Sequence, residues 1–482
     1  MLETIINFLN ALLWGKLLVY GLVAAGLYFT LRLGFIQLTY FKHSLKVMTM
    51  SRQGCDSGLS SFQVFCTSMA ARVGAGNMAG VAVAIGMGGP GAVFWMWLIA
   101  ILGMATAMVE STLAQVYKIR DNDGQFRGGP AYYMEKGLGM RWMGILFSIL
   151  LIIAFGLVFN AVQANTIAGA MEVVFDISPL YMGILLSIAS GFVIVGGIRK
   201  VAKVSEIIVP VMAIAYILIA FIVVVMNIER LPAVFMLIIK SAFGLQEALA
   251  GGVAYSVAQA MQSGIARGLF SNEAGMGSAA NVAASASPNP NHPASQGFVQ
   301  MLGVFSDTIV ICTATAAIIL LSGDVTTVGS DGIKMTILAL SSHVGPWGGG
   351  FVAIAILLFC FTSIIANYSY AETNILFLTG NSKKALPLFR LCVIGMVMFG
   401  AVAKIVLVWN LADVSMGLMA TVNIIALLML SGLAIRVIND YRAQIKAGKI
   451  PEFERNKFPE LCEQLDDDIW PYKIEGTGSK AN

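Results

Sequence analysis

Eleven apolar runs recur between residues 14 and 438 of this 482-residue chain, and they limit the fold more than any other feature. A helix that crosses a bilayer needs about 20 mainly apolar residues, and its backbone must pair internally because hydrocarbon offers no hydrogen bonds. Only 12% of the residues are charged, against about 25% in a typical soluble domain. The sequence therefore predicts an all-α integral membrane protein with about 11 transmembrane helices. The runs cover residues 14–32, 62–85, 93–117, 142–166, 180–198, 207–228, 251–270, 298–321, 349–376, 386–404 and 409–438.

The order of the runs divides the chain into five segments. We expect an extra N-terminal transmembrane helix, a cytoplasmic loop, a first five-helix repeat, a second five-helix repeat and a cytoplasmic tail. Five crossings leave the chain on the opposite side of the membrane from where it started, so the second repeat is inverted relative to the first. The predicted segments are residues 1–35, 36–60, 61–228, 247–438 and 439–482.

Two of the runs are interrupted near their middle. Residues 72–77 read Arg-Val-Gly-Ala-Gly-Asn, and residues 262–268 read Gln-Ser-Gly-Ile-Ala-Arg-Gly. Glycine costs about 1 kcal/mol relative to alanine inside a helix, and unpaired backbone groups in lipid cost more. These interruptions open the first and the second repeat, and paired broken helices in two inverted halves indicate the substrate site of a secondary transporter. The alternative is that the glycines only allow close helix packing.

Lysine and arginine indicate the orientation, because cytoplasmic connections retain positive charge. They gather after the first, third, fifth and ninth runs and again in the tail. This pattern predicts an outside N-terminus and a cytoplasmic C-terminus. The first run follows Glu3 rather than a basic segment, so we expect a retained span and not a removed signal peptide.

Composition and motifs also exclude several classes of function. The net charge of +4 is spread thinly, without a basic stripe, so we expect no nucleic-acid partner. The three histidines form no catalytic motif, and the glycine-rich stretches lie inside apolar runs, so we expect neither an enzyme nor a nucleotide cofactor. A passive channel would need a wide polar path that these runs lack. The scattered cysteines predict free, packed thiols: Cys55, Cys66, Cys312, Cys360, Cys392 and Cys462.

Four longer motifs lie at residues 71–82, 88–97, 128–134 and 264–275. They read ARVGAGNMAGVA, GGPGAVFWMW, GGPAYYM and GIARGLFSNEAG. These motifs resemble those of the sodium:alanine symporter family, the alanine or glycine:cation symporters, and the resemblance extends from the second run to the eleventh. It implies sodium-coupled uptake of small neutral amino acids, above all alanine and glycine. It also implies a leucine-transporter-like fold of five plus five inverted helices in a bacterial inner membrane.

The chemistry of a zwitterionic amino acid selects candidate binding residues. A carboxylate pairs with the exposed N–H groups of a broken helix, which residues 74–77 offer. An ammonium group pairs with carbonyl oxygens, which an unwound stretch around Ser263 and Gly264 would expose. Gln163 carries an amide that both donates and accepts, among small neighbours that suit a compact pocket. The predicted substrate-binding residues are Gly74, Ala75, Gly76, Asn77, Gln163, Gln259, Ser263 and Gly264.

A sodium site is implied by the same resemblance. Sodium prefers hard oxygen ligands, and the family's fold carries a Thr-Ser pair that faces carbonyl groups of its first core helix. Here the implied ligands are the carbonyl oxygens of Ala70 and Val73 with the hydroxyl groups of Thr362 and Ser363. Alternatively, both hydroxyls bond back to carbonyls one turn earlier in their own helix. Arg72 departs from the leucine-transporter pattern, which counts against a second sodium site beside it.

Seven ionisable residues lie inside the runs, where an unpaired charge costs at least about 2.5 to 3.5 kcal/mol. They are Arg72, Glu110, Arg267, Glu273, Asp307, Glu372 and Asp413. We expect several of them to pair and hold the bundle together: Glu110, Arg267, Glu273 and Glu372. Asp307 is a candidate cation ligand or proton acceptor. The predicted function is sodium-coupled import of small neutral amino acids by alternating access, with lipid and sodium as partners, and proton-coupled symport on the same fold is the alternative.

Overall fold

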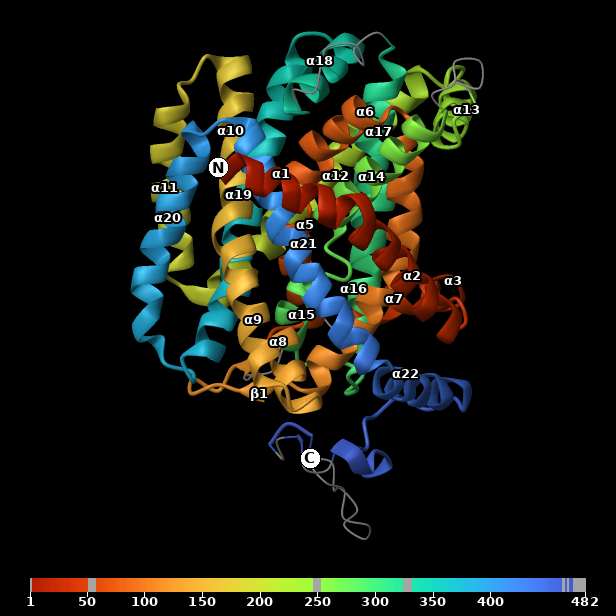
Figure 1. Cartoon of the computed structure of the whole chain (residues 1–482), viewed down its shortest axis with the longest axis vertical. Coiled ribbons are helices and arrows are strands. Elements are labelled where there is room, and N and C mark those ends of the chain that lie inside the picture. Colours follow the sequence, from red (N-terminus) through yellow and green to blue (C-terminus); the bar gives the residue numbers. More distant parts are fainter. Residues whose placement is uncertain are drawn as a thin grey trace.

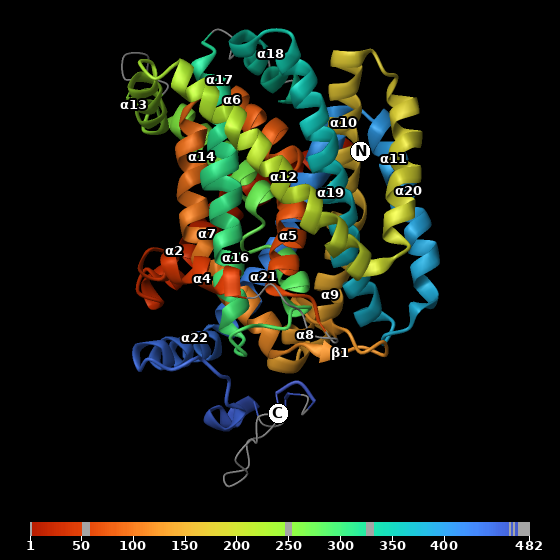
Figure 2. The same cartoon turned by 180° about the vertical axis from the view of Figure 1, so that it is seen from behind.

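The computed structural model describes residues 2–50, 58–245, 253–323, 332–461, 464–465 and 468–470. Within these ranges the chain is a bundle of helices, accompanied by one short antiparallel hairpin in which β1 (Ile119–Arg120) pairs with β2 (Phe126–Arg127). α22 and the segment after it lie at one end of the bundle, and α18 lies at the opposite end (Figures 1 and 2).

The first half of the chain contains a short N-terminal group followed by the first set of long helices. The N-terminal group comprises α1 (Leu2–Leu12), the π-helical η1 (Leu13–Leu17), α2 (Leu18–Arg32), α3 (Ile36–Thr39) and α4 (Phe41–Met50). The next elements are α5 (Ser61–Arg72), the π-helical η2 (Gly76–Gly80), α6 (Val81–Gly88), α7 (Gly91–Val116), α8 (Pro130–Tyr132), η3 (Tyr133–Gly137), α9 (Arg141–Leu151), η4 (Ile152–Val158), α10 (Phe159–Phe175), α11 (Pro179–Ile194), α12 (Gly197–Met226) and α13 (Leu231–Ala242).

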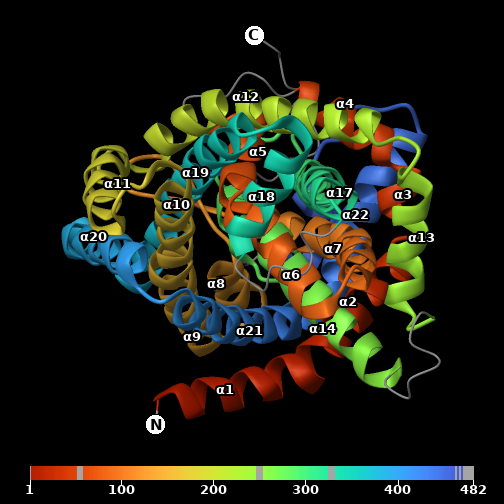
Figure 3. The same cartoon turned by 90° about the horizontal axis from the view of Figure 1, so that it is seen from above.

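The second half begins with a helix that also ends at a break. Its elements are α14 (Val253–Asn272), α15 (Ser278–Ala284), α16 (Ala294–Val304), the π-helical η5 (Phe305–Cys312), α17 (Thr313–Leu321), α18 (Gly332–Val344), α19 (Trp347–Leu378), η7 (Lys383–Ala385), α20 (Leu386–Val402), α21 (Ile405–Met429), α22 (Ser431–Lys446), η8 (Arg455–Lys457) and η9 (Pro459–Leu461). Seen from above, α5, α6 and α18 lie near the middle, whereas α11, α13 and α20 lie at the periphery (Figure 3).

Eight helical stretches of the described chain are long and apolar enough to cross a membrane: Ile6–Arg32, Gly91–Val116, Arg141–Phe175, Gly197–Met226, Ala294–Leu321, Trp347–Leu378, Lys383–Val402 and Ile405–Met429. A ninth is a bent pair, Ser61–Arg72 and Gly76–Gly88, whose axes differ by 49°. Two further predicted spans correspond to α11, which has 16 residues, and to α14, which is rich in alanine, glycine and glutamine. They do not meet the same criteria, so the number of about 11 remains a prediction.

The outer surface of α12 is apolar, as immersion in lipid requires. Ile207, Val211, Ile214, Leu218 and Phe221 are each at least 56% exposed. Their spacing of four and three residues places them on one face of the helix. A contiguous exposed apolar stripe of this kind is unfavourable in water and favourable in a bilayer. The chain is a multi-pass membrane protein.

The break after α5 follows from its local sequence. A capping box starts α5, because the Ser60 side chain accepts from the Gln63 N–H while the Gln63 side chain accepts from the Ser60 N–H. The helix ends at Arg72, and Val73 adopts extended torsions of φ −80° and ψ 96°. The chain resumes at Gly76 as a wide π-helical turn. The predicted interruption at residues 72–77 is therefore present.

The second break lies elsewhere than predicted. Residues 262–268 are helical within α14, so the unwinding expected around Ser263 and Gly264 is wrong. A Cβ atom at Gly264 would collide with the Ala92 carbonyl oxygen, which shows that this glycine serves close packing of α14 against α7. The helix instead breaks at residues 273–277, where Glu273, Gly275 and Gly277 have positive φ angles of 60°, 92° and 78°.

Part of the predicted cytoplasmic tail packs against the bundle. The Trp470 indole N–H donates to the Gln115 carbonyl oxygen at 3.2 Å. The Phe453 N–H donates to the Asn291 carbonyl oxygen at 3.0 Å. Four cysteines are free as predicted, with Cys66, Cys312 and Cys360 buried and Cys392 exposed. Cys55 and Cys462 lie outside the described residues.

Candidate functional site

The first break exposes backbone N–H groups inside the protein, and two side-chain amides accept from them. The Gly74 N–H donates to Asn77 Oδ1, and the Ala75 N–H donates to Gln163 Oε1, each at 2.9 Å. All four residues are buried, and the Gln163 residue is only 2% exposed. Four of the predicted residues thus meet at one point. The amide oxygens occupy positions that another pair of oxygen acceptors could take.

A buried carboxylate stands beside the break. Asn77 Nδ2 donates to Asp307 Oδ1 at 2.6 Å. Ser271 and Thr308 donate their hydroxyl protons to Asp307 Oδ2 at 2.7 and 2.8 Å. The Asp307 side chain, which is 0% exposed, is therefore held by three hydrogen-bond donors, which offset part of the cost of burying it. Ser271 was missed as a candidate, although it lies in the motif at residues 264–275.

Carbonyl oxygens gather around Ser363 on α19. Its Oγ lies 2.8 Å from the Ala70 oxygen, 3.3 Å from the Val73 oxygen and 3.0 Å from the Phe359 oxygen. A hydroxyl group carries one proton, so it satisfies only one of these three acceptors at a time. Thr362 donates to the same Phe359 oxygen at 2.8 Å, so both hydroxyls lie within hydrogen-bond distance of a carbonyl one turn earlier, as the alternative above expects. The result is a compact group of hard oxygen atoms, two of which are carbonyl oxygens from the last turn of α5 and the residue that follows it.

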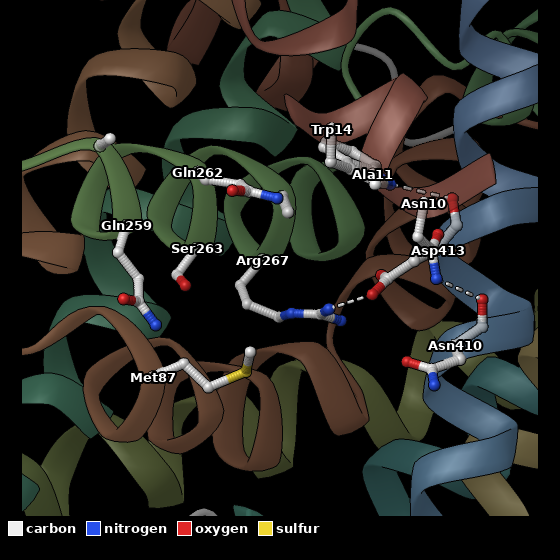
Figure 4. Close-up of a pocket in the computed structure, with 12 residues that line it drawn as sticks. Asn10, Ala11, Trp14, Met87, Gln259, Gln262, Ser263, Arg267, Asn410 and Asp413 are labelled. Carbon is white, nitrogen blue, oxygen red and sulfur yellow. Dashed lines mark hydrogen bonds and ion pairs between the residues drawn. The ribbon is translucent and has the colours of Figure 1, made fainter. Parts of the chain in front are cut away.

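Three predicted binding residues lie away from this break. Gln259 and Ser263 precede Ser271 on α14 by about three and about two helical turns, or about 18 and about 12 Å. They line a separate cavity of about 330 Å³, which Figure 4 shows, together with Arg267 and Asp413. The structure therefore does not bring Gln259, Ser263 and Gly264 together with residues 74–77.

Three aromatic rings cover the break on the side of that cavity. A Cβ atom at Gly76 would lie only 3.0 Å from Phe270 Cδ1, so Phe270 lies directly on the backbone of η2. Phe270 stacks on Phe159 with ring centroids 4.6 Å apart, and its centroid is 4.8 Å from that of Trp409. These rings form an apolar layer between that cavity and the break.

Of the four residues expected to pair, Arg267 and Glu372 form ion pairs, whereas Glu110 and Glu273 accept from neutral donors. Arg267 pairs with Asp413, and Glu372 pairs with Arg127, whose Nη2 lies 3.1 Å from Glu372 Oε1. Glu110 accepts from the N–H groups of the second break, at 3.4 Å from Gly275 and 3.2 Å from Gly277. Glu273 accepts from the Ser278 hydroxyl at 2.7 Å.

Arg72 is the exception among these residues. Its side chain is only 2% exposed, yet its guanidinium group forms no hydrogen bond with any residue that the structure describes. A Cβ atom at Gly303 would collide with Arg72 Nη1, so the glycine in α16 makes room for this group. Among the described residues Arg72 therefore has no ion-pair partner at hydrogen-bond distance, although its charge interacts with those of Glu110 and Glu273.

Comparison with known sequences agrees with these features. Residues 1–455 match the model of the sodium:alanine symporter family. The chain is 52% identical over 459 residues to the probable sodium/glutamine symporter GlnT of Bacillus subtilis (strain 168), covering 94% of each protein. It is 49% identical to the amino-acid carrier protein AlsT of the same organism, covering 95% of this chain and 96% of that protein. It is 37% identical to the sodium/alanine symporter AgcS of Methanococcus maripaludis, covering 90% of this chain and 95% of that protein.

Comparison with solved structures identifies the fold. The chain is similar to MhsT in complex with L-phenylalanine, with a TM-score of 0.51 and 13% identity over 80% of this chain and 99% of MhsT. It is also similar to the manganese transporter of Eremococcus coleocola, with a TM-score of 0.51 and 13% identity over 85% of this chain and 84% of that one. At this identity the likeness concerns the fold alone. It agrees with the predicted transporter fold with broken helices.

Proposed function

Because the chain belongs to the sodium:alanine symporter family and is a sodium-coupled amino acid symporter, not an enzyme, we propose that it imports small neutral amino acids, alanine and glycine, through the break after α5. The observation that carries this proposal is the group of carbonyl oxygens around Ser363, immediately beside the backbone N–H groups of the break. The carbonyl oxygens can bind a cation, and the N–H groups beside them can bind a carboxylate.

The substrate carboxylate binds the two N–H groups of the break. Those of Gly74 and Ala75 now donate to the amide oxygens of Asn77 and Gln163. A carboxylate has two oxygens with the same acceptor chemistry and carries a charge, so it replaces the amides with stronger hydrogen bonds. Glycine at positions 74 and 76 leaves the backbone accessible to it.

The cationic end of the zwitterion lies toward Asp307. This carboxylate is buried and contacts Asn77, so it brings negative charge to the side of the break where the two helices meet. The nearby Phe270 and Phe159 rings limit the space for a side chain. Discrimination between alanine and glycine rests on about one methyl group, which is worth only about 1 to 3 kcal/mol.

Sodium binds between α5 and α19. Its ligands are the carbonyl oxygens of Ala70 and Val73 and the hydroxyl oxygens of Thr362 and Ser363, and the Phe359 carbonyl oxygen lies in the same group. A cation satisfies several of these oxygens at once, which a hydroxyl proton does not. Because α5 and α19 belong to different repeats, the ion stabilises their contact and so couples its binding to the conformation of the break.

We further propose a placement in the bacterial inner membrane with an external N-terminus and a cytoplasmic C-terminus. The distribution of lysine and arginine supports it. The division into an N-terminal helix and two inverted repeats, residues 61–228 and 247–438, is proposed on the same pattern and is compatible with breaks at the start of each repeat.

Uptake of labelled alanine into proteoliposomes tests this function. We expect accumulation with an inward sodium gradient and none with potassium at matched pH. Ser363→Ala removes one ligand, and a hydrogen-bonding contact to a charge is worth about 1.5 to 3 kcal/mol, so the sodium concentration for half-maximal uptake rises about 10- to 100-fold.

Ser369→Ala is the matched control for this variant. Ser369 is also buried in α19, and its hydroxyl donates to the Ala366 oxygen at 2.6 Å, within its own helix. We expect its sodium dependence to equal that of the unmodified protein. Equal sodium dependence of both variants would contradict the sodium site, and equal uptake in sodium and potassium would contradict the coupling.

A further inference from the structure

A cavity of about 380 Å³ opens on the outer surface of the bundle, far from the breaks and from the cavity beside Arg267. Its lining includes Leu38 of α3, Phe41 of α4, Ile101 of α7, and Phe305 and Ile309 of η5. α3 and α4 lie at the periphery of the bundle (Figure 3), closer to α22 than to α18 (Figures 1 and 2). Leu38 is 69% exposed and Ile101 is 40% exposed, so the cavity faces the surrounding lipid.

The wall of this cavity is apolar. Gln37 is the only polar side chain among the described residues that line it. The Gln37 amide nitrogen donates to the Thr30 hydroxyl at 3.0 Å and to the Ile101 carbonyl oxygen at 3.3 Å. Phe41 meets Phe305 edge to face, with ring centroids 4.7 Å apart. Water finds few hydrogen-bond partners in such a space, so an apolar chain is its suitable occupant.

The cavity lies near the middle of the membrane, and α4 lies between it and one interface. Ile101 is about 15 Å from the start of α7 and about 22 Å from its end. His43 of α4 contacts Phe298, which precedes Phe305 by about 10 Å along its helix and also contacts Tyr441 of α22. The hydrocarbon core of a bilayer is about 30 Å thick, so an acyl chain that starts beside α4 reaches the cavity within one leaflet.

The charges around the cavity are positive. Lys42 and Lys46 are exposed and lie one turn apart on α4. Residues 4–55, which include α3 and α4, contain no aspartate or glutamate. Glu110 and Asp307 are the only acidic residues of α7 and η5, and both are 0% exposed. An anionic headgroup is therefore attracted to α4 and meets no exposed carboxylate on the helices that line the cavity.

α4 has the pattern of a helix that lies at a membrane interface. Phe41 and Leu45 are four residues apart and share one face of the helix, and Leu45 is 41% exposed. Lys42 and Lys46 share the adjacent face. The helix therefore presents apolar side chains to an acyl chain and two ammonium groups to a phosphate group on the same side of the bundle.

The inner wall of the cavity belongs to the helix that holds Asp307. Phe305 and Ile309 precede and follow Asp307 by two residues in the π-helical η5. The Asp307 side chain contacts the first break, because Asn77 Nδ2 donates to its Oδ1 at 2.6 Å. Protein interiors transmit displacements between packed neighbours, so a chain packed against Phe305 and Ile309 restrains η5 and thereby the position of Asp307.

We propose that this cavity binds one acyl chain of an anionic phospholipid, whose phosphate group lies against Lys42 and Lys46, and that the bound lipid restrains η5 and increases the rate of transport. A zwitterionic phospholipid offers the same chains, but its headgroup adds a positive charge that the lysines repel. The lipid site does not depend on the proposed function. Its effect on transport rests on that function.

Native mass spectrometry of the full-length protein in detergent tests the site. The probes are dioleoyl phosphatidylglycerol, which is anionic, and dioleoyl phosphatidylcholine, which is zwitterionic and has the same acyl chains. Each lysine near a phosphate group strengthens binding about fivefold, so we expect phosphatidylglycerol to bind at least about tenfold more tightly than phosphatidylcholine. The double variant Lys42→Gln, Lys46→Gln should bind phosphatidylglycerol about 30-fold more weakly and phosphatidylcholine as before.

Each variant has a matched control. Lys200→Gln with Lys203→Gln makes the same charge change at two exposed positions of α12, on the side predicted to be cytoplasmic and away from the cavity. Ile101→Trp fills the cavity without a change of charge and should also weaken binding of phosphatidylglycerol. Ile149→Trp on α9, where Ile149 is 45% exposed and does not line the cavity, should not. The two test variants act on opposite ends of the lipid, so a folding defect in one leaves the other to decide.

Equal binding of the two lipids by the unmodified protein, or equal weakening in the test variants and their controls, would overturn the site. Sodium-driven alanine uptake is then compared in vesicles of phosphatidylcholine alone and of phosphatidylcholine with an equal amount of phosphatidylglycerol. We expect faster uptake with phosphatidylglycerol for the unmodified protein and no difference for Ile101→Trp. Uptake that does not depend on the lipid would refute the link through η5. Normal lipid binding without uptake in any vesicle would refute the proposed function and leave the lipid site established.

Discussion

Substitution of Gly74 by alanine should abolish transport, although it adds only one methyl group. An ideal Cβ atom at this position would collide with Ser363 Oγ and would lie 2.7 Å from Gln163 Oε1 and 3.2 Å from Gln163 Cδ. Both neighbours must move. Their displacement disturbs the cluster of carbonyl oxygens around Ser363. It also removes the acceptor of the Ala75 N–H.

The size of the effect follows from these two disturbances. Forcing an extra methyl group into a packed site costs about 1 to 3 kcal/mol, and leaving a buried N–H without an acceptor costs about 1 to 3 kcal/mol, so Gly74→Ala should lose about 2 to 6 kcal/mol of stability. Gly74 lies in the break and not in a helix, so no gain in helix propensity offsets this cost.

Gly80→Ala is the matched control, because a Cβ atom there would lie 3.6 Å from the Ala75 oxygen and 3.7 Å from the nearest atom of Trp409. These are ordinary contacts, and alanine is better than glycine in a helical segment by up to about 1 kcal/mol. Thermal unfolding in detergent and sodium-driven alanine uptake should separate the variants, with Gly80→Ala close to the unmodified protein. Normal uptake by Gly74→Ala, or equal damage in both variants, would refute the argument.

Three further predictions concern charged groups. Asp307→Asn keeps the size of the side chain but removes its charge, so we expect normal membrane insertion with strongly reduced sodium-driven uptake; unchanged uptake would contradict a role for that charge. Arg127→Gln leaves Asp121 and Glu372 buried without their cation, which should cost about 3 to 5 kcal/mol and lower the melting temperature; an unchanged melting temperature would show that the pair is dispensable. Burial lowers the pKa of His292 below its ordinary value of 6.5. As the pH falls below 6.5, the unfolded chain therefore binds a proton at His292 that the folded chain does not bind. The stability that is present above pH 6.5 is lost as the pH falls through the pKa of His292 in the folded protein. Melting temperatures measured between pH 7.5 and 5.5 should therefore fall less steeply for His292→Gln, and parallel curves would exclude this contribution.

Much of the fold was predictable from the sequence because a bilayer restricts the choices of a chain. Long apolar runs must become helices, and glycines beside a charged residue and an amide mark a helix that does not continue. The first break was predicted at residues 72–77 for this reason, and the structure has it there. The function was predicted from the resemblance of the motifs to a known family. The pattern of apolar runs and breaks alone did not decide between sodium and proton coupling.

The second break shows where such reasoning fails. Gly264 and Gly268 resemble the glycines of the first break, yet both lie in a continuous helix that packs closely on α7. Glycine supports unwinding and close packing equally well, and only the neighbouring helix decides between them. The break occurs instead where Glu110 accepts from the N–H groups of Gly275 and Gly277, and that partner lies more than 160 residues away in the chain.

The amino-acid sequence by itself determined that this chain is a helical membrane protein with a helix broken at residues 72–77, because those features depend on local composition and periodicity. Only the tertiary structure decided which oxygens gather at Ser363, that Arg267 pairs with Asp413, and that Gln259 and Ser263 line a separate cavity and not the break. The physical reason is that each of these features joins helices distant in sequence. Hydrogen bonds and ion pairs across such distances depend on the relative rotation and depth of the helices, which no local pattern specifies.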